Sequence, residues 1–132
     1  MISPRTILVA DDDKELVMAI KTRLQAQGYH VIIAFDGQET VKLVLESEPD
    51  LVLLDVLMPV IDGYACLRQI NARLGRGKIP VVVLTSRDYM KDLFTLEGIE
   101  DYILKPFDSE DLVLRIEQVF KRRANLNPPA AG

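Results

Sequence analysis

Five short apolar runs alternate with five longer segments of helical periodicity, and this alternation constrains the fold more than any other feature of the chain. The apolar runs cover residues 6–10, 29–34, 51–54, 79–84 and 101–104. Apolar side chains recur at spacings of three and four, as on one face of a helix, in residues 14–27, 39–46, 62–74, 88–97 and 108–120. Strands that alternate with helices in this way predict an α/β fold, in which helices cover both faces of a parallel sheet.

The third apolar run ends in an acidic residue. Leu51-Val-Leu-Leu54 has no polar break, which is typical of an inner strand buried on both faces, and it stops at Asp55. Pro59 prevents a long continuation of this strand. An aspartate in such a place often only caps a turn. In open α/β sheets, however, ligands bind at the carboxyl edge of the strands, so Asp55 is also a candidate functional residue.

Other polar residues follow the neighbouring strands. Because parallel strands all end at the same edge, that edge would carry Asp11 and Asp12 from the first strand, Asp55 from the third, Thr85 from the fourth and Lys105 from the fifth. Clustered carboxylates repel one another unless a cation lies among them. Oxygen ligands favour Mg²⁺ or Ca²⁺, and we expect Mg²⁺ because it keeps water and shares its shell with phosphate oxygens.

These residues meet the needs of phosphoryl transfer. An aspartate beside Mg²⁺ can attack phosphorus and form an aspartyl phosphate. The reaction depends mainly on positioning and on neutralising charge. Mg²⁺ and Lys105 would neutralise the phosphoryl oxygens, and Thr85 would donate a hydrogen bond to one of them.

Four motifs at these strand ends, taken together, resemble the receiver domain of bacterial two-component response regulators, of which CheY is a member. They are Ile7-Leu-Val-Ala-Asp-Asp12, Asp55-Val-Leu-Met-Pro59 with Asp62-Gly63, Val83-Leu-Thr-Ser86, and Tyr102-Ile-Leu-Lys-Pro-Phe107. The resemblance covers about residues 5–122 and implies a flavodoxin-like, doubly wound sheet of five parallel strands, order 2-1-3-4-5, with five helices. We expect a receiver domain over residues 1–123 and a flexible tail or linker over residues 124–132.

The resemblance also implies residue roles. Asp55 matches the phosphoacceptor. Asp11 and Asp12 match the acids that bind Mg²⁺ together with Asp55, and Leu57 matches the residue whose backbone carbonyl completes the metal site. The remaining matches are a switch hydroxyl, a switch aromatic and a phosphoryl-binding lysine before a cis-proline: Thr85, Tyr102, and Lys105 with Pro106.

As a receiver, the chain would take a phosphoryl group from a sensor histidine kinase or a phosphotransfer protein onto Asp55. Phosphorylation would switch a surface read by a downstream protein, usually the face formed by the fourth helix, fifth strand and fifth helix. Whether it also drives homodimerisation stays open. We expect catalysis only of the domain's own phosphorylation and dephosphorylation, so the chain is not expected to be an enzyme. Residues 85–102 are about two residues shorter than in a typical receiver, which predicts a short or irregular fourth helix.

Composition excludes several other classes. The net charge of −4 disfavours a nucleic-acid partner, because no basic surplus is available to neutralise phosphates. The single cysteine excludes an internal disulfide, and the single histidine argues against a multi-histidine zinc site. No apolar run approaches the roughly 20 residues of a membrane span, and the first residues lack the apolar core of a signal peptide. We therefore expect a cytoplasmic protein.

Two alternatives remain from other functional classes. One is a phosphohydrolase with an aspartyl-phosphate intermediate, but such enzymes generally carry the nucleophile on the first strand and have a cap domain, for which 132 residues leave no room. The other is a degenerate receiver that acts only as an unphosphorylated docking module. Whether the chain is a stand-alone receiver or part of a longer regulator also stays open.

Overall fold

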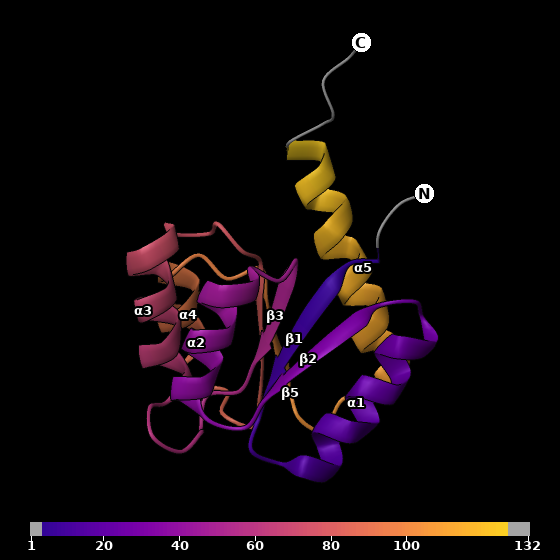
Figure 1. Ribbon diagram of the computed structural model, residues 1–132, viewed down its shortest axis with the longest axis horizontal. Coiled ribbons are helices and arrows are strands. Elements are labelled where there is room, and N and C mark those ends of the chain that lie inside the picture. The colour runs from indigo at the N-terminus through magenta and orange to yellow at the C-terminus, as the bar shows by residue number, and fades with distance from the viewer. Residues whose placement is uncertain (1–3, 127–132) are drawn as a thin grey trace.

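The computed structural model describes residues 4–126 and confirms the alternation of strand and helix within them (Figure 1). The strands are β1 (Thr6–Ala10), β2 (His30–Ala34), β3 (Leu51–Leu54), β4 (Val81–Thr85) and β5 (Asp101–Leu104). The helices are α1 (Lys14–Ala26), α2 (Gly37–Ser47), α3 (Gly63–Leu74), α4 (Lys91–Leu96) and α5 (Ser109–Leu126).

The strands form one parallel sheet in the order β2-β1-β3-β4-β5, which confirms the predicted topology. β1 and β3 pair with their last residues opposite each other, so Asp11 and Asp55 leave the sheet as neighbours. The Asp55 amide donates to the carbonyl of the last β1 residue at 2.9 Å, which continues the pairing beyond the strand ends. Thr85 pairs with the last residue of β5, and this brings Lys105 to the same edge.

Each face of the sheet has its own apolar core. Helices α1 and α5 cover one face, and α2, α3 and α4 cover the other (Figure 1). Leu51 and Leu53 pack on the α1–α5 side, whereas Val52 and Leu54 pack on the opposite side. Because β3 is buried on both faces, none of these four side chains is more than 1% exposed. This explains why the apolar run has no polar break.

Aspartates start the three helices that follow β1, β2 and β3. Asp13, Asp36 and Asp62 are the N-caps of α1, α2 and α3, and each accepts a hydrogen bond from the amide three residues later, at 3.1, 2.7 and 2.8 Å. Each cap satisfies one of the unpaired N–H groups of a first helical turn. The first turns of these helices therefore lie beside the carboxyl edge of the sheet.

Two helices differ from the predicted ranges. α4 has six residues, which confirms the predicted short fourth helix, but it begins at Lys91 rather than 88; Met90 provides no side-chain cap, and only Phe94 of this helix is buried. α5 ends at Leu126, beyond the predicted domain boundary at residue 123, so residues 124–126, which we assigned to a flexible tail, are helical. Arg123 explains the extra turn, since its guanidinium binds Glu100 at 2.5 Å. Residues 127–132 of the predicted tail lie outside the described residues.

None of the helices in the described part of the chain is both long enough and apolar enough to cross a lipid bilayer.

Candidate functional site

Three carboxylates meet at the carboxyl edge of the sheet, where the sequence predicted them. Asp11 and Asp12 follow β1 and Asp55 follows β3, and carboxylate oxygens of all three lie within 4.8 Å of one another. Asp11 and Asp55 are buried, with 3% and 7% of their surface exposed, whereas Asp12 is exposed. A group of acids that is partly buried and open on one side can hold a cation and still admit a second ligand.

Lys105 reaches this acidic group from the far side of β4. Its ammonium lies 2.6 Å from Asp11 Oδ2 and 3.6 Å from Asp55 Oδ2. The Lys105 amide donates to the Thr85 carbonyl at 2.8 Å, and the Lys105–Pro106 peptide bond is cis, as the resemblance implied. The lysine therefore neutralises Asp11 most directly and Asp55 more weakly.

The charged form of Asp55 is less favourable, relative to its protonated form, than in an ordinary solvent-exposed aspartate. Burial raises its pKa, and the nearby charge of Asp11 raises it further. Lys105, the Val56 amide and the Thr85 hydroxyl act in the opposite direction without cancelling the rise. The Val56 amide donates to Asp55 Oδ1 at 2.8 Å. An added cation would stabilise the charged carboxylate.

The donor set fits a hard divalent cation such as Mg²⁺. The acidic group offers carboxylate oxygens, and neither a sulfur nor an imidazole is among its three members. Asp11 Oδ1 already accepts from the Asp13 amide at 3.0 Å, which fixes that carboxylate in place. Asp12 is exposed and can reach solvent and a hydrated ion. Leu57 lies two residues after Asp55, and because its side chain carries no oxygen, only its backbone carbonyl is a candidate ligand.

The two candidate switch residues meet at a third residue, Arg87. Thr85 is 1% exposed, and its Oγ1 accepts from the Arg87 amide at 3.2 Å. Tyr102 is 8% exposed, and its hydroxyl donates to the Arg87 carbonyl. Thr85 and Tyr102 are thus both bound to the segment that connects β4 to α4, and a movement of that segment would affect both.

Sequence reasoning missed two backbone features of the site. The first is the Val56 amide on Asp55; every residue except proline has such a donor, so no sequence signal marks it. The second is Gly63, where a Cβ would lie 2.1 Å from the Asp55 carbonyl oxygen. Asp62-Gly63 belongs to the motifs that carry the resemblance, but no contact of Gly63 with the Asp55 backbone was inferred from it.

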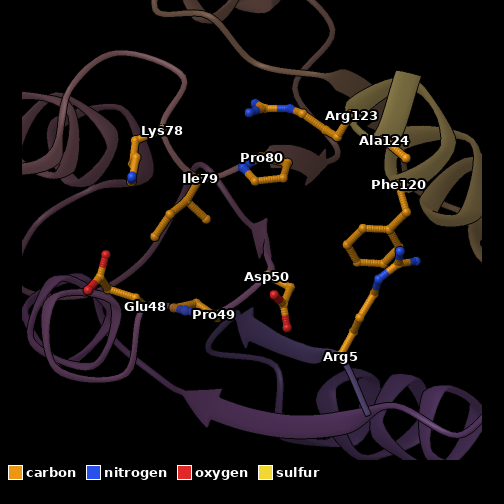
Figure 2. Close-up of a pocket in the computed structure, with 10 residues that line it drawn as sticks. All are labelled: Arg5, Glu48, Pro49, Asp50, Lys78, Ile79, Pro80, Phe120, Arg123 and Ala124. Carbon is orange, nitrogen blue, oxygen red and sulfur yellow. The ribbon is translucent and has the colours of Figure 1, made fainter. Parts of the chain in front are cut away.

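A cavity of about 380 Å³ opens at the other end of the strands and does not belong to this site (Figure 2). Both signs of charge line it, and the Arg5 guanidinium lies 4.3 Å above the Phe120 ring. Its lining residues come from the segments before β1, β3 and β4 and from the end of α5: Arg5, Glu48, Pro49, Asp50, Lys78, Ile79, Pro80, Phe120, Arg123 and Ala124. None of the residues in the acidic group or its lysine contributes to this cavity.

Comparisons with known proteins found a matching family model and similar solved structures. The family model of the response regulator receiver domain matches residues 7–117. A CheY-like receiver domain protein from Methanospirillum hungatei is similar in structure, with 26% identity, a TM-score of 0.86, and coverage of 93% of this chain and 98% of that one.

Two further solved structures contain magnesium. The receiver domain of a Pseudomonas aeruginosa sensor histidine kinase, with a magnesium ion coordinated in its active-site cleft, is 29% identical with a TM-score of 0.78, over 87% of this chain and 96% of that one. The response regulator TrrA of Thermotoga maritima, in complex with Mg²⁺ and BeF, is 26% identical with a TM-score of 0.78, over 86% and 97%.

Proposed function

Because the chain belongs to the response regulator receiver domain family, we propose that it accepts a phosphoryl group on Asp55 in a Mg²⁺-dependent reaction and thereby switches a partner-binding surface. One observation carries the proposal. Asp55 is buried beside Asp11, its pKa is raised, and Lys105 lies within reach of both carboxylates. A carboxylate held beside a lysine ammonium can attack a phosphoryl group whose oxygens the ammonium neutralises.

In the proposed reaction, a carboxylate oxygen of Asp55 forms a bond to phosphorus. The bond from phosphorus to the donor's histidine nitrogen breaks, and the electron pair leaves with that nitrogen. Asp11, Asp12, Asp55 and the Leu57 carbonyl would hold Mg²⁺, which supplies positive charge for the phosphoryl oxygens when bound. Lys105 can exchange its contact with Asp11 for a phosphoryl oxygen because it already lies between the two carboxylates.

The phosphoryl donor in this proposal is a sensor histidine kinase or a phosphotransfer protein. The domain would catalyse only its own phosphorylation and dephosphorylation, without a separate substrate. We place the reaction in the cytoplasm, where the single buried thiol, Cys66, would stay reduced.

The output would pass through the segment between β4 and α4. Thr85 can donate its hydroxyl to the phosphoryl group, and this movement would pull on the Arg87 amide that it now binds. Tyr102 binds the carbonyl of the same residue and would respond. The adjoining face of α4, β5 and α5 exposes apolar side chains that a partner protein could cover, namely Leu93, Leu96, Leu104 and Leu114.

Intact-mass spectrometry tests the proposal. Incubation with Mg²⁺ and acetyl phosphate should add one phosphoryl group to the chain, and chelation of Mg²⁺ should prevent it. The Asp55→Asn variant is the matched control and should stay unmodified. An adduct of equal yield in Asp55→Asn would place the phosphoryl group elsewhere and contradict the assignment of Asp55, whereas no adduct in any sample would favour the docking-module alternative.

A further inference from the structure

We propose that Gly37, the first residue of α2, is a positioning residue for the metal site. Its contact with the loop between β3 and α3, residues 55–62, holds that loop in the shape that sets Asp55 and the Leu57 carbonyl for the cation. The inference rests on the proposed function, because it concerns the same metal site. Gly37 itself touches neither the acidic group nor a reacting atom; it would act through the loop.

The first observation is that no side chain fits at Gly37. A Cβ built there would lie 2.0 Å from the Ile61 carbonyl oxygen and 2.5 Å from Ile61 Cγ1, although real Cβ atoms essentially never come within 3.0 Å of another heavy atom. Gly37 lies within a helix and does not have a positive φ. The closeness of the loop backbone therefore requires glycine here, and not an unusual backbone conformation.

Hydrogen bonds join Gly37 to the structure on both sides. Its amide donates to the Pro59 carbonyl in the loop at 3.1 Å. Its carbonyl accepts from the Cys66 thiol on α3 at 3.0 Å. Burial raises the pKa of Cys66 to about 12, so the thiol keeps its proton and remains a donor at neutral pH. The start of α2 is therefore fixed between the loop and α3.

The other end of the loop is held in a similar way. The Gly63 amide donates to the Val56 carbonyl at 2.7 Å, and a Cβ on Gly63 would lie 2.1 Å from the Asp55 carbonyl oxygen. Asp55 and Leu57 thus lie in a segment that α3 fixes at one end and Gly37 fixes at the other. Gly63 touches Asp55 directly, so only Gly37 can be changed without a direct effect on the nucleophile.

The backbone between these contacts is strained. Val60 has a φ of +73° and is 70% exposed. This left-handed conformation is sterically unfavourable for a β-branched residue such as valine. Backbone strain of this kind persists only where the surrounding structure imposes it. The exposed Val60 side chain cannot impose it. The Ile61 amide donates to the Pro59 carbonyl at 3.0 Å across Val60, and the Gly37 amide donates to the same carbonyl at 3.1 Å, so backbone contacts hold this turn. The contact with Gly37 is one of them, and its loss would let the loop change shape.

Replacement of Gly37 by alanine should therefore weaken Mg²⁺ binding. Contacts that orient metal ligands typically change affinity by about 10–100-fold when they are lost. Alanine is the better helix former, so the change does not weaken α2 through helix propensity. The effect would come from the Ile61 backbone, which has to move away from the new methyl group.

The test is the dissociation constant of Mg²⁺ for the whole chain, from a titration followed by amide chemical shifts of Asp11 and Asp12. Gly37→Ala should raise this constant at least about tenfold. Gly28→Ala is the control: Gly28 has a φ of +94° and a Cβ there would meet nothing within 4 Å. The control variant places a Cβ at a positive φ far from the loop, where only the substitution is strained, and it should bind Mg²⁺ as the wild type does.

A second measurement on the wild type decides the matter if Gly37→Ala does not fold. Coupling between sites is reciprocal, so Mg²⁺ should slow hydrogen exchange at the Gly37 amide. The Gly28 amide, which donates to Gln25 within the end of α1, should not respond.

Unchanged Mg²⁺ affinity in a folded Gly37→Ala variant would overturn the inference and leave the proposed function intact. If that variant does not fold, an unchanged exchange rate at the wild-type Gly37 amide would overturn it instead. A wild type that binds no Mg²⁺ would contradict the proposed function and the inference together.

Discussion

Asp55 carries its charge in surroundings that disfavour it. Burial and the charge of Asp11 raise its pKa, and the contact with Lys105 does not offset them. The native state therefore holds the Asp55 proton up to a higher pH than the unfolded chain does. The contribution of Asp55 to the free energy of unfolding is most favourable at low pH. It falls as the pH rises from the pKa of Asp55 in the unfolded chain to its higher pKa in the native state. Without metal, neutral pH is thus an unfavourable condition for Asp55.

This gives a prediction for Asp55→Asn, which removes the charge and keeps the shape. In the presence of a chelator, the variant should be more stable than the wild type at pH 7. The difference should shrink toward acidic pH, where Asp55 is protonated in both states. Urea unfolding of both proteins over a pH series measures it. A variant less stable than the wild type at pH 7 would show that the Lys105 contact dominates.

At this scale the sequence predicted which residues meet but not how they are paired. Periodicity predicts that Asp11, Asp55 and Lys105 lie at one edge of a parallel sheet, and the strand order implied by the resemblance makes them neighbours. The closer pairing of Lys105 with Asp11, at 2.6 Å against 3.6 Å to Asp55, depends on side-chain torsions. Those torsions depend on packing, which a linear pattern does not contain.

In the loop between β3 and α3, the positive φ of Val60 predicts how substitutions at this position change stability. Glycine adopts the left-handed conformation of this residue without a steric penalty. Val60→Gly should relieve the strain and raise the free energy of unfolding by about 1 kcal/mol, after the added flexibility of the unfolded chain is allowed for. Val60→Ala is the control: it keeps a Cβ and should gain less. Chemical denaturation of the wild type and the two variants measures their free energies of unfolding. A lower value for Val60→Gly than for Val60→Ala would contradict the prediction.

The attachment of helix α4 to α3 gives a second prediction for the elements. It has six residues and no side-chain cap, but its end is attached to α3. Tyr64 donates to the Glu97 carboxylate at 3.2 Å, and Asn71 donates to the Glu97 carbonyl at 2.9 Å. Phe94, fully buried, packs edge-on against the Tyr64 ring with the centroids 5.4 Å apart. We therefore expect the end of α4 to be its fixed part.

Glu97→Ala should remove the carboxylate partner of Tyr64 and lower the free energy of unfolding by about 1 kcal/mol. In Glu97→Ala, amide hydrogen exchange should accelerate relative to the wild type more in α4 than in α3. Glu46→Ala, at an exposed position of α2, is the control and should change stability by less than about 0.5 kcal/mol. Equal effects of the two substitutions would show that the contact does not hold α4.

The start of α4 also shows where element prediction fails, although the shortness of this helix was predicted. Its apolar spacing in residues 88–97 is weak, and tertiary contacts at Phe94 and Glu97 decide which residues become helical. α5 is the opposite case, because Arg123 gains a partner in Glu100 and the helix continues past its last apolar contact. Both boundaries depend on contacts between residues distant in sequence.

For the whole molecule, the alternation of strand and helix predicted the α/β class with a parallel sheet, and the family resemblance supplied the strand order that the structure confirms. Five unbroken or nearly unbroken apolar runs admit a parallel sheet with two cores, and both cores are present. The same topology gathers the acids and Lys105 at one edge. It also connects that edge to the face of α4, β5 and α5 through Thr85, Arg87 and Tyr102. Our central claim is that a phosphoryl group at Asp55 changes this face.

Amide NMR spectra of the wild type with Mg²⁺ and beryllofluoride, a mimic of the phosphoryl group, test this claim most directly. We predict shifts in two regions, around Asp55 and Thr85 at the edge, and along α4 and around Tyr102 at the face. Asp55→Asn under the same conditions should show neither. Shifts confined to the edge would contradict the switch, and an unchanged spectrum would contradict the phosphoacceptor role itself.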